Sequence, residues 1–351
     1  METWLDSLVA KLQRHPKRVV FPDGADPRIL QAARQLANYR CAVPIVLGDR
    51  SVIKETARRL ALRLDHIRVL EPARSDDLDL FLPMLDEVPR WGALPNDEKV
   101  AMLRDHHNFA ALMVTTGRAD ALVAGATMRT SSALRSLFRI IPRLPGVEAC
   151  SSLLVVDREK PEVGPEGRLF LADCGVIPEP TAEQLADIAV ATADFAYHLT
   201  GECPRVAFLS YSTQMRTVRD PSINRLRAGL ALARERFEGR QMPVELSGEM
   251  QLDAAINPEV AAQKGLADDP VAGRANVLIF PNLHAGNLAA KTLQTLAGAH
   301  TYGQLITGLA KPCAEISRGA LVYDIWGTAV VTAARAVDPT LLYGAREPDK
   351  G

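Results

Sequence analysis

The sequence has few cysteines, few aromatic residues and no long apolar run. Its five cysteines among 351 residues are scattered and form no Cys-x-x-Cys pair, which argues against a disulfide framework or a cysteine-based zinc site. No apolar run approaches the ~20 residues that a membrane helix needs, so we expect no membrane-spanning segment. The N-terminus also lacks the basic and then apolar pattern of a signal peptide. Together these features predict a cytoplasmic protein.

An excess of charge of one sign is missing as well. The formal net charge is -1 and the pI is about 6.7. A balanced chain has no general attraction to nucleic acid or to an anionic membrane, so we expect neither as a partner. Any anion-binding site must therefore be a local cluster of Arg and Lys side chains.

Several familiar catalytic motifs are absent. The chain contains no Gly-x-Gly-x-x-Gly, no P-loop, no His-Glu-x-x-His and no Gly-x-Ser-x-Gly sequence. These absences argue against a dinucleotide-dependent enzyme, a P-loop NTPase, a zinc protease and an α/β-hydrolase. The seven histidines show no metal-binding spacing, and His284, the only one in a candidate site loop, is interpreted as structural. We therefore expect no metal.

What the sequence does contain is an alternation of short apolar runs with amphipathic stretches. Such runs, each paired with a helical pattern, are typical of parallel strands buried on both faces, and they predict an α/β fold. The length predicts two domains. We expect strands over residues 18–21, 43–47, 67–70, 120–124, 152–156, 169–172, 206–209 and 277–280. We expect helices over residues 27–36 and 53–62, and one from a capping box at Thr181 to Phe195.

One pair of predicted strands differs from the rest. Strands 152–156 and 169–172 flank residues 158–167, a polar stretch rich in Pro and Gly that reads as a surface loop. Two strands joined in this way can form a hairpin, so we expect an antiparallel element there.

Polar side chains follow five of the predicted strands. Ligands of α/β sheets gather outside the carboxyl ends of the strands, which makes this placement relevant to function. Taken singly, each of these residues is more often a cap or a loop residue. They are Asp23, Asp26 and Arg28; Thr130, Ser131 and Arg135; Asp173; Ser210, Ser212 and Thr213; and Asn282, His284 and Asn287.

Two further segments concentrate charge. Arg135 and Arg139 are four residues apart and share a helix face, which suits either a solvated basic face or a phosphate clamp. Ser317, Arg318 and Asp324 lie within eight positions, in a turn and at the start of a new apolar pattern. This trio suits a reaction that holds an anion and removes a proton, although an N-capping turn with a salt bridge is the structural alternative.

The chain resembles the phosphate acetyltransferase family over nearly its whole length. Each matching segment is weak alone, but the ordered set is specific. The segments are Phe21-Pro22-Asp23-Gly24 with Asp26 and Arg28, Asp120 to Ala126, Thr130 with Arg135, Asp173-Cys174, Pro180 to Ala186, Leu209 to Thr213, Gly248-Glu249 with Asp253 to Ala255, Phe280 to Leu283, Gly286-Asn287 with Lys291, Gly308 to Pro312, and Ser317-Arg318-Gly319 with Asp324.

This resemblance implies two α/β domains with an interdomain cleft, related to the isocitrate and isopropylmalate dehydrogenase fold. The first domain would comprise residues 1–146 plus 306–351, and residues 147–305 would form an inserted second domain. The implied protein is a homodimer that interconverts acetyl phosphate plus CoA with acetyl-CoA plus phosphate. CoA and acetyl-CoA are then substrates, and no tightly bound cofactor is expected.

The resemblance also assigns roles to residues. Asp324 would take the proton of the CoA thiol, Arg318 would stabilise negative charge, and Ser317 would donate a hydrogen bond at the same place. The remaining positions would bind substrate; they are Arg135, Thr130, Ser212, Thr213, Asn287, Lys291 and Arg90.

Some positions depart from the family pattern. Residues 214–219 replace a small Gly-Ser loop, Arg90 stands in a reduced basic segment with a shifted register, Gln304 replaces a proline, and Ala314-Glu315 replaces Asn-Asp. These changes leave open a transferase for propionyl or butyryl groups, although the retained Ser-Arg-Gly with Asp324 favours acetyl.

Two alternatives of other classes also remain. A catalytically silent acetyl-CoA-sensing domain is disfavoured by the intact site residues. A decarboxylating dehydrogenase of the same fold would need an Asp cluster for a divalent metal, and the sequence shows none.

Overall fold

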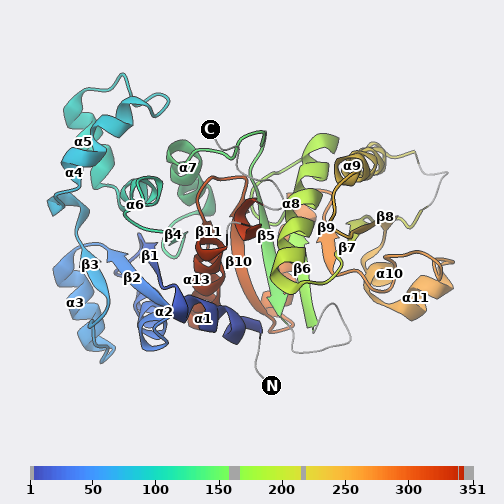
Figure 1. Cartoon of the computed structure of the whole chain (residues 1–351), viewed down its shortest axis with the longest axis horizontal. Helices are drawn as coiled ribbons and strands as arrows, with labels where there is room; N and C mark the ends of the chain where they lie inside the picture. Colours follow the sequence, from blue (N-terminus) through green and yellow to red (C-terminus); the bar gives the residue numbers. More distant parts are fainter. Residues whose placement is uncertain (1–3, 158–166, 215–218, 339, 344–351) are drawn as a thin grey trace. The chain divides into compact units, whose positions relative to one another are not determined.

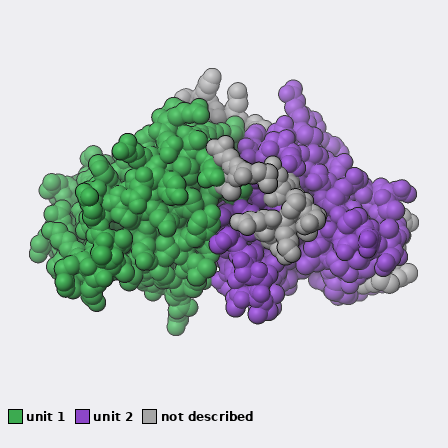
Figure 2. Space-filling view, turned by 90° about the horizontal axis from the view of Figure 1, so that it is seen from below, with its two compact units in different colours: residues 1–146, 309–342 green, residues 147–308, 343–351 purple. Residues whose placement is uncertain are grey.

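A computed structural model describes residues 4–157, 167–214, 219–338 and 340–343 of the chain. The chain forms two compact units, one of residues 1–146 with 309–342 and the other of residues 147–308 with 343–351 (Figure 2). Each unit has its own set of strands and helices, and each is described by itself.

The sheet of the first unit is parallel throughout its described pairings. The strands follow the order β3-β2-β1-β4-β11. Their apolar residues are fully buried, as at Val19, Val20 and Phe21 of β1, which explains the near-continuous apolar runs in the sequence. The strands are β1 (Lys17–Phe21), β2 (Ala42–Leu47), β3 (Arg68–Leu70), β4 (Ala121–Ala124) and β11 (Cys313–Glu315).

Helices cover both faces of this sheet. The helix α6 packs on β1 and β4 and against α7, whereas α13 packs on β1, β4 and β11 and against α1 and α2 (Figure 1). The helices are α1 (Trp4–Arg14), α2 (Pro27–Asn38), α3 (Arg50–Arg59), α4 (Leu78–Phe81), α5 (Asn96–Arg104), α6 (His106–Thr115), α7 (Thr130–Ile140), α13 (Val322–Val337) and α14 (Thr340–Tyr343), with short 3-10 turns η1 (Pro72–Arg74) and η2 (Pro83–Asp86).

The sheet of the second unit is mixed. Its strands follow the order β10-β5-β6-β9-β7-β8, and β5 pairs antiparallel with both β6 and β10, whereas the other pairs are parallel. The strands are β5 (Ser151–Asp157), β6 (Arg168–Ala172), β7 (Arg205–Leu209), β8 (Glu245–Met250), β9 (Val277–Ile279) and β10 (His300–Thr307). The helices are α8 (Ala182–Thr200), α9 (Pro221–Phe237), α10 (Leu252–Ile256), α11 (Pro258–Gln263) and α12 (Leu283–Thr295).

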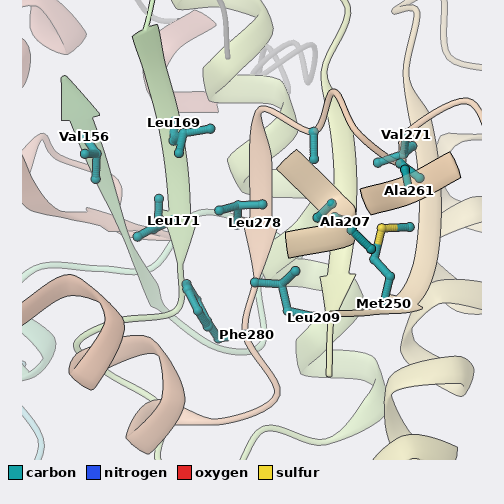
Figure 3. Close-up of a cluster of buried hydrophobic side chains, with 14 of the residues drawn as sticks. Val156, Leu169, Leu171, Ala207, Leu209, Met250, Ala261, Val271, Leu278 and Phe280 are labelled. Carbon is teal, nitrogen blue, oxygen red and sulfur yellow. The ribbon is translucent and has the colours of Figure 1, made fainter. Parts of the chain in front are cut away.

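A continuous apolar cluster fills one face of this second sheet. Figure 3 shows Leu171, Leu278 and Leu209, from the neighbouring strands β6, β9 and β7, in the same buried cluster as Ala261 and Val271. Burial of apolar area on this scale is the main favourable term for the unit. It fixes the strands whose carboxyl ends carry the polar residues described below.

The α/β fold class and most predicted elements are confirmed. The hairpin of β5 and β6 is antiparallel as expected, and the capping box at Thr181 is present, with the Thr181 and Gln184 side chains each bonded to the other's backbone. Residues 158–166 of the predicted loop lie outside the described part of the chain. The helix predicted over 53–62 starts and ends three residues earlier. Its start is set by the Asp49 carboxylate, which caps it by accepting from the amides of Ser51 and Val52.

Three strands were not predicted: β8, β10 and β11. The first two carry polar residues between apolar ones, as in Ser247 and Gln304, and β11 has only three residues. Within the described ranges no helix has the length and apolarity needed to cross a bilayer. No group of three or more His, Cys, Asp or Glu side chains in the same ranges has the geometry to hold a metal ion.

Candidate active site

The turn after β11 carries Ser317 and Arg318, and Asp324 follows in the first turn of α13. The Ser317 hydroxyl accepts from the Gly319 amide at 3.2 Å, and the Arg318 side chain is exposed. Asp324 is 9% exposed. The cap of α13 is Leu321, which makes no side-chain cap bond. Neither Ser317 nor Asp324 is therefore the cap residue of α13, and the chemical role of the trio stays a prediction.

Glycine allows two loops of this unit to approach each other closely. Gly125 ends β4 with φ +114°, and a Cβ there would lie 2.4 Å from the backbone oxygen of Ile316. The Ile316 amide in turn donates to Ala124 O at 2.7 Å. The turn that carries Ser317 and Arg318 is thus held directly against the end of β4.

The carboxylate of Asp23 ties the loop after β4 to the end of β1. It accepts from the amides of Gly125 (3.0 Å) and Ala126 (3.2 Å) and from the Thr127 hydroxyl. His107 Nε2 lies 3.6 Å from the same carboxylate. Burial opposes ionisation, but His107 and the other donors outweigh it and lower the pKa of Asp23 to about 2. Asp23 is therefore an ionised structural anchor.

Thr130 and Arg135 both lie on α7. Thr130 begins the helix and donates to Glu315 Oε1 at 2.7 Å, which joins α7 to the end of β11. The Arg135 side chain is exposed. The guanidinium of Arg139 lies over the Trp91 ring, 5.0 Å from its centroid. This contact brings the segment of the exposed Arg90 next to α7, so both predicted phosphate-binding arginines belong to one neighbourhood of the first unit.

In the second unit, Asp173 organises the loop after β6. Its carboxylate accepts from the amides of Gly175 (3.0 Å), Val176 (3.2 Å) and Ile177 (2.7 Å), and from the amide and hydroxyl of Ser152. Burial raises the pKa of Asp173 above its usual value, although these hydrogen bonds oppose the shift. The Ser152 hydroxyl also contacts Gln304 Oε1 at 2.8 Å.

The predicted residues Asn287 and Lys291 lie one turn apart on α12. Asn287 Nδ2 donates to Cys174 O at 3.2 Å, and Lys291 Nζ donates to Gln294 Oε1 at 3.0 Å. The helix approaches the Asp173 loop at Gly286, where a Cβ would lie 2.2 Å from Asp173 O. Asn287 is therefore brought to the Asp173 loop, whereas Lys291 points to solvent with an exposed side chain.

Ser212 and Thr213 follow β7, a strand that pairs with β9 beside β6. Ser212 is 4% exposed, and its hydroxyl has no hydrogen-bond partner among the described residues. Thr213 Oγ1 accepts from the Gln251 amide at 3.1 Å. The next residue, Gln214, donates to Asp269 Oδ2 at 3.0 Å. Residues 215–218 of the departure from the family loop lie outside the described part.

Each unit thus gathers its own share of the predicted residues. The first holds Ser317, Arg318, Asp324, Thr130, Arg135 and Arg90, and the second holds Asn287, Lys291, Ser212 and Thr213. The sequence assigned no structural role to His107, and it placed Arg28 only among the polar residues that follow a strand. Glu315 and Gln304 were noted only as departures from the family pattern. One sequence signal could have indicated the structural role of Arg28. It is the Asp26-Pro27-Arg28 sequence directly after a strand, in which an N-cap residue is followed by a proline.

Comparison with known proteins identifies the family. A family model described as Phosphate acetyl/butaryl transferase matches residues 3–333. A phosphate acetyltransferase of Treponema pallidum (strain Nichols) is 36% identical over 337 residues, which are 95% of this chain and 99% of that protein.

Solved structures agree with this assignment. A phosphotransacetylase from Streptococcus pyogenes superposes with a TM-score of 0.81 at 33% identity, and the EutD phosphotransacetylase from Staphylococcus aureus with 0.80 at 32%. Each match covers 95% of this chain and 98% of the other. The chain therefore belongs to the Phosphate acetyl/butaryl transferase family and is an acyltransferase.

Proposed function

We propose that this chain interconverts acetyl phosphate plus CoA with acetyl-CoA plus phosphate, by direct attack of the CoA thiolate in a ternary complex. The observation that carries this proposal is the match over 95% of the chain to a phosphate acetyltransferase, together with the presence of Ser317, Arg318 and Asp324 in this sequence. We assign the two compact units as its two domains, the second inserted into the first.

Asp324 is the proposed base. In the forward step its carboxylate takes the thiol proton, the sulfur bonds to the acetyl carbonyl carbon, and the carbon–oxygen bond to phosphate breaks with its electron pair leaving on phosphate. The reverse step returns the proton to the thiol. The position of Asp324 beside a turn with a hydroxyl and a guanidinium suits this role.

The energetics constrain how the proton moves. An ordinary thiol near pKa 8.5 and an ordinary aspartate near 3.9 differ by about 4.6 units, so free transfer is uphill by roughly 6 kcal/mol. Proton removal concerted with attack on the carbonyl avoids a free thiolate. The acyl phosphate is already activated, so positioning and charge stabilisation supply much of the rate.

Arg318 and Ser317 supply the charge stabilisation. The exposed Arg318 guanidinium offers a fork of donors to the developing thiolate or to the acyl phosphate. The Ser317 hydroxyl accepts from the Gly319 amide, and as a hydroxyl it is a donor as well as an acceptor, which suits a hydrogen bond toward the reacting groups. Both groups act where negative charge develops, in agreement with electrostatic catalysis.

The remaining residues bind the substrates in this proposal. Arg135, Thr130 and Arg90 hold phosphate groups from the first unit. Ser212, Thr213, Asn287 and Lys291 contact CoA or the acyl phosphate from the second. The Ser212 hydroxyl has no hydrogen-bond partner within the part of the chain that the structure describes. This supports a binding role, because a buried hydroxyl without a partner costs free energy until a ligand satisfies it. A homodimer in the cytoplasm completes the proposal, and five free thiols suit that reducing compartment.

The experiment is a substrate series. Purified protein is mixed with CoA and acetyl, propionyl or butyryl phosphate, and the thioester absorbance is followed. We expect the highest kcat/KM with acetyl phosphate. Preference for a longer acyl phosphate would move the chain to that substrate class. Absence of thioester with every acyl phosphate, together with measurable CoA binding, would favour the sensing domain and reject the enzyme.

A further inference from the structure

Arg28 is the second residue of α2, and it makes an unusually complete set of contacts. Asp26 caps the helix by accepting from the Arg28 amide at 2.8 Å. The same carboxylate accepts from Arg28 Nε (3.1 Å) and Nη2 (2.8 Å). The charge of Arg28 is thus neutralised, and its orientation fixed, by its own helix cap.

The other donors of Arg28 bond to the backbone of two loops. Nη2 donates to Ala126 O at 2.9 Å, and Nη1 donates to Arg318 O at 2.5 Å and to Ala320 O at 3.2 Å. An arginine side chain has five N–H groups. Each of the five therefore has an acceptor within the protein, and no fork remains to bind a phosphate.

These acceptors lie at the reactive turn. Inside the turn, Ser317 accepts from Gly319 and Ala320 through its hydroxyl and its backbone oxygen. These two hydrogen bonds do not involve the carbonyl oxygens of Arg318 and Ala320, which accept from Arg28. Ala320 also directly precedes Leu321, the cap of α13 that makes no side-chain cap bond. Arg28 therefore fixes the backbone from which the Arg318 side chain extends. It also fixes the backbone at the start of α13, the helix that bears Asp324.

We propose that Arg28, oriented by Asp26, is a positioning residue for this transferase, which clamps the Ser317–Ala320 backbone and does not contact substrate. The inference rests on the function proposed above. A displacement of about 1 Å at reacting groups is enough to cost roughly 100-fold in rate. The backbone clamp is therefore expected to act on kcat.

The test compares Arg28→Lys with Arg34→Lys. Lysine keeps the charge at Arg28 but cannot span five acceptors. Arg34 is a matched control on the same helix, since its Nη1 also donates to two backbone oxygens, those of Arg63 (2.9 Å) and Asp65 (2.8 Å), away from the turn. For Arg28→Lys we expect kcat to fall about 100-fold, with KM for CoA and for acetyl phosphate within about threefold of wild type. For Arg34→Lys we expect both within about twofold.

Amide hydrogen exchange gives a readout that needs no turnover. Loss of the clamp should speed exchange in the peptide containing residues 316–321 in Arg28→Lys and not in Arg34→Lys. A KM increase of tenfold or more with kcat preserved would show that Arg28 contacts substrate and would overturn the proposal. So would exchange and kcat that match the control. If Arg28→Ala is also made and does not fold, the lysine variant decides alone. A wild-type protein that makes no thioester would reject the proposed function, and the exchange result would still judge the clamp.

Discussion

Two buried aspartates occupy equivalent places in the two units. Asp23 follows β1 and Asp173 follows β6, and each carboxylate gathers backbone amides at the carboxyl end of its sheet. Asp23 reaches across to the loop after β4, whereas Asp173 binds mainly its own loop. The same residue type at the same kind of strand end thus fixes one loop in each unit.

The two carboxyl groups differ in their side-chain neighbours. His107 Nε2 lies 3.6 Å from Asp23, and the pKa of Asp23 falls to about 2 despite burial. Each described donor to Asp173 is a neutral amide or hydroxyl, and burial raises its pKa. The His107 imidazole beside Asp23 therefore accompanies the opposite direction of the two shifts. We infer that ionised groups carry the chemistry in the first unit, and that neutral contacts such as that of Asn287 contribute to binding in the second.

The largest expected effect tests this division of labour. Asp324→Asn removes the proposed base of the first unit and should lower kcat roughly a thousandfold, with little change in KM. Asn287→Ala removes a neutral contact of the second unit. It should raise KM for CoA about fivefold and leave kcat within about threefold. Steady-state kinetics with CoA and acetyl phosphate measure both.

The thermal melting curves of the two variants are the control for folding. The comparison breaks if Asn287→Ala loses as much kcat as Asp324→Asn, because the second unit would then take part in the chemical step. Unchanged turnover in Asp324→Asn would reject the base itself.

Much of the fold could be read from local pattern. The buried parallel strands β1, β2, β4 and β9 appear in the sequence as apolar runs, because both of their faces are covered. The strands that were not predicted, such as β8, pair with neighbouring strands in the sheet but carry polar residues. Their sequences therefore lack both the apolar run and the alternating pattern that indicate a strand.

The site was less predictable, because contacts between distant segments decide its roles. The family resemblance supplied Ser317, Arg318 and Asp324 with their order. It could not show that His107, on a helix far along the chain, lies beside the Asp23 carboxylate, or that Glu315 accepts a hydrogen bond from the Thr130 hydroxyl. Arg28 reaches residues 290 and 292 positions away. Such pairings depend on tertiary structure alone.

Asp23→Asn should have the next largest effect, on stability. The folded-state pKa of about 2 lies below the unfolded value of 3.8, so the ionised carboxylate contributes about 2 kcal/mol to the free energy of unfolding at neutral pH. This contribution is full above pH 3.8 and is lost as the pH falls toward 2. Urea unfolding at pH 7 should show the variant less stable by about that amount, and the gap should close in acid.

His107→Gln is the companion variant. Without the imidazole, the pKa of Asp23 should rise, so the acid loss of stability should begin at a higher pH than in wild type. If Asp23→Asn keeps the wild-type slope between pH 4 and 2, another carboxyl group produces that slope and Asp23 is not the ionised anchor.

Asp173→Asn should show the smallest effect, with the opposite sign. Because folding raises the pKa of Asp173, the folded state favours its protonated form. That stabilisation is present at low pH and is lost as the pH rises through the folded pKa. As the pH falls from neutral toward 4, wild type should therefore gain stability relative to Asp173→Asn. The gain should be smaller than the effect at Asp23, since five hydrogen bonds oppose burial. Urea titrations across this range measure it. A wild-type protein that instead loses stability relative to the variant would mean that amide and hydroxyl donors alone can outweigh burial. The His107 imidazole would then no longer explain why the two aspartates differ.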